Sequence, residues 1–252
     1  MDPPNRLRDV LSGYFPALER SFDYAHSRGA LVLLTGYQTL DAIRRIGQSR
    51  LRNWLGKRKV RSADQLAGAA VAAAKAQHTL VPGQEVAASI VADLAAELLA
   101  IGSRITELDA RIAATFRAHP QAEIIESLPG MGPILGAELI AAAGDLNGYA
   151  NAGRLASAAG LVPVSRDSGR RTGNLHRPTR YSRKLRRAFY LSASAAMMRE
   201  GPNRDFYLKK RGEGLKHVQA LIALAHRRVD VLWALLRDNR VFELSPPGPR
   251  TA

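Results

Sequence analysis

The apolar residues between positions 87 and 115 recur at alternating spacings of three and four, and this pattern restricts the segment to a long α-helix. One seam position holds Val91, Leu98, Ile105 and Ile112, and the other holds Ala87, Leu94, Ile101, Leu108 and Thr115. A seam of β-branched residues and leucines is typical of a two-stranded coiled coil. We therefore expect residues 86–118 to pair two copies of the chain. The alternative is an ordinary amphipathic helix packed on its own domain, and the seam leaves both open.

The rest of the chain also predicts helices, so the expected fold is mainly α with at most a small β-hairpin. Four segments are expected: a helical segment over 1–80, the coiled-coil helix over 81–120, a helix-hairpin-helix with a C-terminal domain over 121–243, and a disordered tail over 244–252. Only 160–175 offers room for the hairpin. Two amphipathic helices are expected at 181–199 and 214–237. The first sixty residues end in a basic patch, Lys57–Arg61.

The composition excludes several classes of protein. The chain has no cysteine, so disulfides and thiolate zinc sites are excluded. Its six histidines lack the spacing of metal ligands. The most apolar stretch, 86–101, contains Asp93 and Glu97, and no uncharged apolar run approaches the roughly 18–20 residues of a membrane helix. We therefore expect a cytoplasmic protein with no membrane partner and no metal or other cofactor bound by this chain.

Positive charge is concentrated in one segment. Residues 166–228 hold 17 Lys and Arg against 4 Asp and Glu, a net charge of +13 out of the +15 of the whole chain. Such a localised field attracts a polyanion, and phosphate contacts with counterion release supply the affinity for nucleic acid. The candidate phosphate-binding residues are Arg166, Arg170, Arg171, Arg177, Arg180, Arg183, Lys184, Arg186 and Arg187.

A second candidate nucleic-acid contact is the turn Pro129–Gly132, in which Gly130, Met131 and Gly132 precede a helix opened by Pro133. Two glycines let bare backbone approach a ligand, and the free amides of a helix start favour a phosphate. The pattern is that of a helix-hairpin-helix, with Ala137 where the two helices approach closely. It would hold the backbone of nucleic acid without selecting sequence. A glycine-rich turn between two packed helices remains the alternative.

Several ordered motifs carry a family resemblance. They are LPGMGPILGAELIAAAGD (128–145), AAGLVPVSRDSGR (158–170) and RYSRKLRRAFYLSASAAMMR (180–199), followed by a basic and helical stretch over 206–238. Together they resemble the C-terminal half of the DEDD-type insertion-sequence transposases, the IS one-ten family, which is related to the Piv and MooV DNA invertases. The resemblance covers essentially the whole chain.

The resemblance implies a DNA recombinase that excises and inserts its element, guided by a structured RNA. It implies a RuvC-like N-terminal half whose Asp, Glu, Asp, Asp set binds a divalent metal such as Mg²⁺. It also implies a serine nucleophile in the Ser-Gly stretch, which here is Ser168, with Ser165 as the nearest rival. A serine needs a proton acceptor and a group that neutralises the developing charge, and Arg166, Arg170 and Arg171 suit the second need.

The sequence departs from the family pattern at its start. No hydrophobic strand ending in Asp opens the chain, and no Asp-x-x-Asp pair occurs near its beginning. We therefore expect a form lacking the RuvC-like half, which binds nucleic acid and does not cleave it alone. The alternative is a stand-alone helix-hairpin-helix protein that binds DNA or structured RNA without any chemistry.

Overall fold

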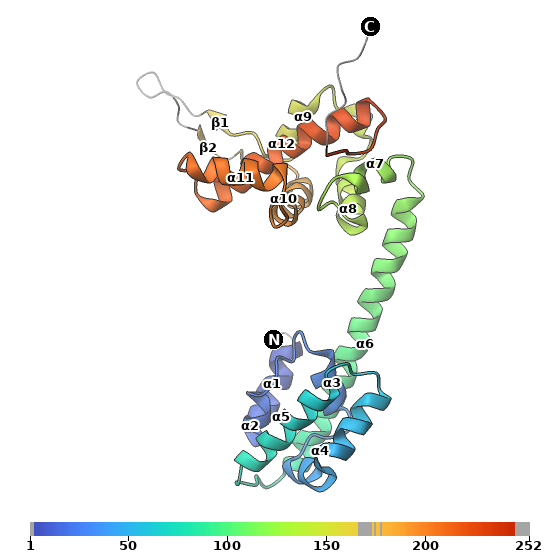
Figure 1. Cartoon of the computed structure of the whole chain (residues 1–252), viewed down its shortest axis with the longest axis vertical. Helices are drawn as coiled ribbons and strands as arrows, with labels where there is room; N and C mark the ends of the chain where they lie inside the picture. Colours follow the sequence, from blue (N-terminus) through green and yellow to red (C-terminus); the bar gives the residue numbers. More distant parts are fainter. Residues whose placement is uncertain (1–2, 166–172, 174, 177, 245–252) are drawn as a thin grey trace. The chain divides into compact units, whose positions relative to one another are not determined.

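The long apolar repeat forms one helix, α6 (Gln84–Arg117), of 34 residues (Figure 1). A computed structural model describes residues 3–165, 173, 175–176 and 178–244. The chain divides into two units, Met1–Glu107 and Leu108–Ala252, so α6 contributes residues to both. One hydrophobic core lies in each unit.

The described residues of the first unit form helices only. These are α1 (Pro3–Tyr14), α2 (Pro16–Glu19), α3 (Arg28–Leu34), α4 (Leu40–Lys57), α5 (Ala63–Ala76) and the part of α6 up to Glu107. Helix α5 packs extensively on α4 because its buried face is largely alanine, which lets two helix backbones approach. Gly47 interrupts α4 with a φ of 69°, so that residues 40–46 and 48–57 form two separate helical segments.

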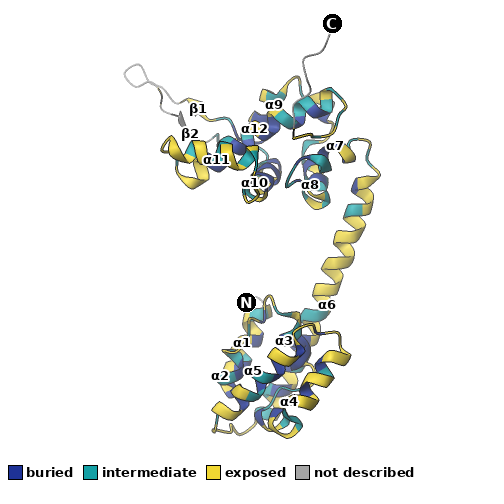
Figure 2. Ribbon diagram, in the orientation of Figure 1, coloured by how far each residue is buried: buried dark blue, intermediate teal, exposed yellow. Residues whose placement is uncertain are grey.

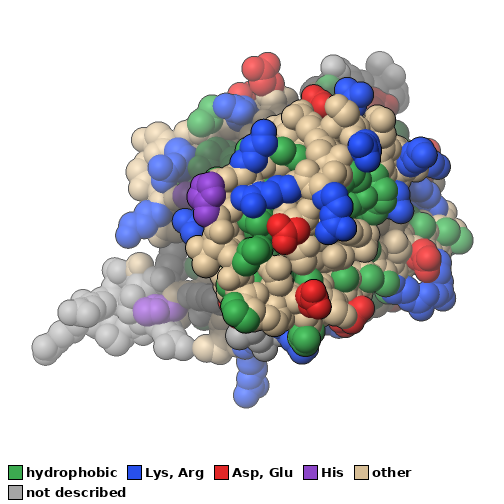
Figure 3. All heavy atoms as spheres, turned by 90° about the horizontal axis from the view of Figure 1, so that it is seen from below, with side chains coloured by type: hydrophobic (Ala, Val, Ile, Leu, Met, Phe, Trp, Pro, Cys, Tyr) green, Lys and Arg blue, Asp and Glu red, His purple; other side chains and the backbone are tan. Residues whose placement is uncertain are grey.

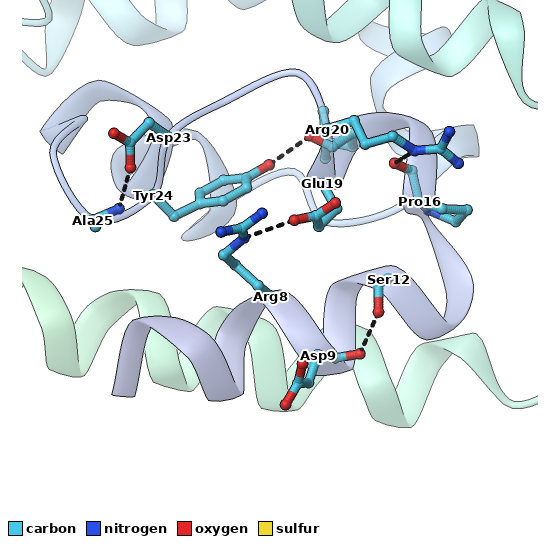
Figure 4. A network of polar contacts seen from close by, with 10 residues as sticks. Arg8, Asp9, Ser12, Pro16, Glu19, Arg20, Asp23, Tyr24 and Ala25 are labelled. Carbon is cyan, nitrogen blue, oxygen red and sulfur yellow. Dashed lines mark hydrogen bonds and ion pairs between the residues drawn. The ribbon is translucent and has the colours of Figure 1, made fainter. Parts of the chain in front are cut away.

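Polar contacts fix the loops of the first unit around its core (Figure 4). Arg8 Nε donates to Glu19 Oε1 at 2.7 Å, and the buried hydroxyl of Tyr24 donates to the carbonyl of Leu18 at 2.8 Å. Burial raises the pKa of the Tyr24 hydroxyl, which therefore stays protonated and keeps donating. The guanidinium of Arg44 donates to the carbonyls of Ala74 and Gln77, two acceptors that the end of α5 leaves without helical partners.

The second unit contains α7 (Ala122–Ser127), α8 (Pro133–Ala143), a short 3₁₀ turn (Leu146–Gly148), α9 (Ala152–Ala158), α10 (Arg183–Met197), α11 (Pro202–Gly212) and α12 (His217–Arg237). Two short antiparallel strands, β1 (Val164–Ser165) and β2 (Leu175–His176), pair Val164 with His176. The prediction of a mainly helical chain with at most a small hairpin is confirmed. Helix α11 was not predicted, because it contributes no buried residue to give its sequence a periodic apolar face.

Helix α6 changes its surroundings along its length (Figure 2). Ala88, Val91, Leu94 and Ala95 are buried in the core of the first unit. Further along the same seam, Ile101, Ile105, Leu108 and Ile112 are 41%, 54%, 39% and 40% exposed. The first part of the predicted seam therefore packs within its own unit, which corrects the expectation that all of it faces a second chain. For residues 101–112, pairing with a second copy stays a prediction.

Within the described residues, α6 is also the one helix long and apolar enough to cross a membrane by length and composition. The sequence argument excluded such a run because it counted only uncharged stretches, and α6 contains Asp93 and Glu97. One helix of this kind is weak evidence of a span, because core helices of globular proteins share these properties. Val91 and Ala95 of this helix are buried in the core of the first unit, whereas only 22% of its most apolar 18-residue window is buried.

Candidate nucleic-acid interface

The Ser-Gly segment connects the two strands of the small hairpin. Ser165 is the exposed last residue of β1 and lies opposite Leu175 of β2. The proposed nucleophile Ser168 lies outside the described residues, as do four of the candidate phosphate-binding residues: Arg166, Arg170, Arg171 and Arg177. The hairpin therefore fixes where this segment leaves and rejoins the fold.

The first turn of α10 follows the hairpin and carries a cluster of cations. Ser182 caps this helix, and its hydroxyl accepts a hydrogen bond from the Leu185 amide at 3.3 Å. Arg183 and Lys184 are exposed there, and the turn holds no acidic residue. Neither side chain forms an ion pair with any residue that the structure describes. Cations at a helix N-terminus oppose the helix dipole by about 0.3–1 kcal/mol each, so they do not stabilise α10.

The next two arginines of α10 are engaged within the unit. Arg186 donates from a guanidinium nitrogen to the carbonyl of Gly160 at 2.7 Å and lies over the ring of Tyr181. Gly160 has a φ of 64°, and a Cβ there would lie 2.5 Å from that ring, so glycine is required for this close approach. Arg187 forms an ion pair with Glu138 of α8. Of the four predicted cations on α10, Arg183 and Lys184 thus have exposed charged groups that form no ion pair with the described residues.

The turn between α7 and α8 has two residues packed inside the unit, Gly130 and Met131, and one exposed residue, Gly132. Gly130 has a φ of 78°, and a Cβ on it would lie 2.6 Å from the carbonyl oxygen of Ser192 in α10. Met131 is 1% exposed and belongs to the core. Gly132 is exposed and caps α8, with no atom within 4 Å of a Cβ built on it. Close packing on α10 accounts for the glycine at Gly130, so of the two glycines only Gly132 leaves its backbone open to a ligand.

The close approach of the two hairpin helices also differs from the sequence prediction. It lies at Gly136 and not at Ala137, which is half-buried. A Cβ at Gly136 would lie 2.5 Å from the ring of Phe116 and 3.2 Å from a methyl group of Ile125. The phenyl ring from the end of α6 therefore determines which position must be glycine, and no helix-hairpin-helix pattern takes that ring into account.

Beside the basic end of α10, a cavity of about 550 Å³ opens between the turn before β1, strand β2 and helices α10 and α12. Its polar lining comes from Arg186, His176, Gln219 and His226, and the other lining residues are mostly apolar. The described residues contain no cluster of three or more His, Asp or Glu that could hold a metal ion. The Mg²⁺ implied by the family resemblance therefore has no fitting ligand set in the described part of the chain.

Arg228 is a functional candidate that the sequence argument missed. Its side chain lies in the middle of the second unit, 1% exposed. One terminal nitrogen donates to the carbonyl of Pro129 and to the hydroxyl of Ser192, both at 2.5 Å, and the other donates to Asn203 at 3.2 Å. Burial lowers the pKa of Arg228 to about 10, which leaves it charged at neutral pH. This guanidinium connects the turn before α8 to α10, α11 and α12.

Comparison with known proteins finds a family similarity over part of the second unit. Residues 122–208 match the transposase IS116/IS110/IS902 family. That range contains the turn at Gly130, the strand hairpin and the basic start of α10.

Known relatives extend the similarity over nearly the whole chain. The uncharacterized 44.8 kDa protein of insertion element IS116 from Streptomyces clavuligerus is 61% identical over 248 residues, which cover 98% of this chain and 62% of that protein. The uncharacterized 42 kDa protein of IS900 from Mycobacterium paratuberculosis is 54% identical, covering 96% and 60%. The 43.6 kDa protein of IS110 from Streptomyces coelicolor is 35% identical, covering 97% and 60%. The chain thus spans about three fifths of the length of these relatives.

Replacing Arg228 with alanine should lower the free energy of unfolding of the second unit by about 3 kcal/mol or more, because it leaves Pro129 and Ser192 with unpaired buried acceptor and hydroxyl groups. Urea denaturation followed by circular dichroism measures this loss. The matched control is Arg204→Ala, at an exposed position of α11, which should change the same quantity by less than about 0.5 kcal/mol. Equal effects of the two substitutions would show that the buried contacts of Arg228 do not hold the unit together.

Proposed function

We propose that this chain is part of a transposase, a site-specific DNA recombinase of an insertion sequence, and that the residues present bind nucleic acid. The family match over 122–208 and the 61% identity to a protein of an insertion element support the proposal. Because the chain spans 62% of that relative, strand cleavage and joining are proposed for the whole protein. Its partners are DNA and a structured guide RNA, and its place of action is the cytoplasm, where both are found.

The cationic first turn of α10 is the observation that carries the binding proposal. Arg183 and Lys184 stand where the helix dipole disfavours positive charge, and neither is neutralised by a described carboxylate. A phosphate placed between them would remove both penalties and release counterions. The same turn directly follows the hairpin that carries the Ser168 segment. Phosphate contacts there would hold the nucleic-acid backbone beside that segment without selecting sequence.

Neutralising this turn should weaken binding of all DNA sequences alike. The double variant Arg183→Gln and Lys184→Gln should reduce the slope of log affinity against log salt by about 2, because each lost phosphate contact accounts for about 0.9. Fluorescence anisotropy with unrelated duplexes at several salt concentrations measures both affinity and slope.

The matched control removes two charges elsewhere in the same unit, at Arg199 and Arg204, which are exposed beyond the other end of α10. This control should leave the slope unchanged. If the control lowers the slope as much as the first variant does, DNA affinity depends on the net charge of the protein alone. The start of α10 would then not be a phosphate-binding site.

Ser168 is proposed as the nucleophile of the whole protein, on the strength of its position in the Ser-Gly stretch of the family domain. Its hydroxyl oxygen would form a bond to a backbone phosphorus, and the bond from that phosphorus to the next sugar oxygen would break. The serine proton goes to a base, and the departing oxygen takes up a proton. Arg166, Arg170 and Arg171, in the same segment, suit the charge that develops on the phosphate.

A covalent adduct tests this assignment. The chain is joined to the part of the IS116 protein that it does not cover, and the chimera is incubated with labelled element ends and Mg²⁺. We expect a protein–DNA adduct on a denaturing gel, its loss in Ser168→Ala, and its retention in Ser165→Ala. Loss in Ser165→Ala with retention in Ser168→Ala would assign the nucleophile to Ser165.

Pairing of two chains is proposed for the exposed part of the α6 seam. Ile101, Ile105, Leu108 and Ile112 recur at the spacing of a coiled coil and lie open to solvent. Apolar side chains in such a stripe gain about 25 cal/mol for each Å² that a second helix covers. The pairing would place two copies of the family domain in one assembly, as recombination of two DNA ends requires.

Charges placed in this stripe should therefore prevent pairing. Sedimentation at micromolar concentration should give a dimer for the native chain and a monomer for the variant Ile105→Glu and Ile112→Glu. The control Ser103→Glu and Ala110→Glu puts the same charges on the opposite side of the helix and should remain dimeric. A monomeric native chain would contradict the proposal.

A further inference from the structure

The first unit carries a second basic surface, which consists of α4 and the turn after it. Between Arg44 and Arg61 the sequence holds eight Lys and Arg and no Asp or Glu. All eight are exposed: Arg44, Arg45, Arg50, Arg52, Lys57, Arg58, Lys59 and Arg61. Figure 3 shows a face of the molecule on which many Lys and Arg side chains lie, with Asp and Glu side chains between them. The family match begins at residue 122, so it does not include this surface.

Some of these cations have partners within the unit. Arg44 is used to cap α5, and Arg58 stacks on the ring of Trp54 at 3.6 Å. Arg52 lies 4.0 Å from Asp64, with both side chains more than half exposed, so this pair contributes little. Five cations form no ion pair with the described residues: Arg45, Arg50, Lys57, Lys59 and Arg61. The fold therefore does not account for most of this charge.

The second helical segment of α4, residues 48–57, arranges its side chains in three strips. Leu51 and Leu55 are buried and fix the inner side. At about 100° per residue, the opposite side is centred on Ser49, Asn53 and Gly56, all exposed. Small and polar residues thus form the outermost ridge of the helix.

Basic residues flank that ridge on both sides. Arg50 and Lys57 lie along one flank, and Arg52 lies along the other, by the same helical spacing. Gly56 has no atom within 4 Å of a Cβ built on it, which leaves the ridge narrow at that point. A narrow polar ridge with two cations on one flank and one on the other is complementary to a groove whose floor is polar and whose two edges are anionic.

The dimensions favour duplex DNA as the occupant. An α-helix with its side chains is about 10–12 Å across, and the major groove of B-form DNA is about 12 Å wide. The major groove of A-form RNA is too deep and narrow for such a helix. Binding of single strands relies on exposed aromatic rings, whereas Trp54 of this segment is half-buried against Tyr37 and covered by Arg58.

We propose that residues 48–57 of α4 enter the major groove of duplex DNA, with Ser49 and Asn53 at the base edges and the flanking Arg50, Arg52 and Lys57 on the two phosphate backbones. Kinking at Gly47 sets this segment off from residues 40–46, which are anchored by Leu40 and Ile43. The inference rests on the proposed function only in taking DNA as the ligand, and it concerns a different surface.

The test compares neutral variants of the full chain by fluorescence anisotropy on a duplex DNA at several salt concentrations. The variant Arg50→Gln, Arg52→Gln and Lys57→Gln should lower the slope of log affinity against log salt by about 2 to 3. The control removes three other exposed charges of the same unit, with Arg6→Gln, Arg20→Gln and Arg28→Gln, and should keep the native slope. Circular dichroism confirms that both variants fold.

A second variant tests the groove itself without changing charge. Asn53→Trp places a bulky ring on the outermost ridge and should weaken duplex DNA binding at least tenfold, while affinity for an RNA hairpin stays unchanged. Unchanged DNA affinity, or an equal loss for the RNA hairpin, would overturn the proposal.

Comparison with the Arg183→Gln and Lys184→Gln variant separates the two surfaces. If only the α10 variant loses DNA affinity, the α4 inference fails and the proposed contact at the start of α10 stands. If only the α4 variants lose DNA affinity, the α4 inference stands and the proposed contact at the start of α10 fails.

Discussion

One buried guanidinium holds the second unit in its shape. Arg228 reaches from α12 to the carbonyl of Pro129, to the hydroxyl of Ser192 and to the side chain of Asn203, so a single cation connects four elements. Its hydrogen-bond partners are all uncharged, and its buried Nε has no hydrogen-bond partner among the described residues. The contacts of its two terminal nitrogens therefore compensate for the cost of burying this charge. Gly130 lies at the same junction, where any side chain would meet the backbone of α10. The position of the turn before α8 therefore depends on a glycine and an arginine together.

The sequence predicted a mainly helical chain with at most a small hairpin, because apolar periodicity and turn residues are local signals, and it missed α11, which has no buried residue. It did not predict the burial of Arg228, because arginine is normally a surface residue and this one was counted in the basic segment. The buried stripe of α12 accordingly includes Leu221, Leu224 and Arg228, whereas the apolar Val218 of the same helix is half exposed. Which side of a helix is buried is decided by neighbouring elements, and these are not visible in one sequence.

For the candidate site too, the sequence predicted the location of the basic segment but not the contacts of its individual residues. A basic segment around the Ser-Gly stretch could be located from composition, but the separate roles of its arginines could not. Arg186 and Arg187 look equivalent in sequence to Arg183, yet they bind Gly160 and Glu138. Only one end of the basic surface of α4, the patch Lys57–Arg61, was noted from the sequence. Net charge was summed over everything outside residues 166–228, and the acids of other helices cancelled the eight cations of this segment.

The cations at the start of α10 link the stability of the protein to its ligand. Arg183 and Lys184 repel each other and the helix end, so the free protein is less stable than one with neutral residues there. A phosphate bound there, as proposed, would relieve this repulsion and stabilise the folded state by mass action. Selection for thermal robustness alone would therefore replace these two residues and remove the proposed phosphate contact, which is the trade-off common to preformed binding sites.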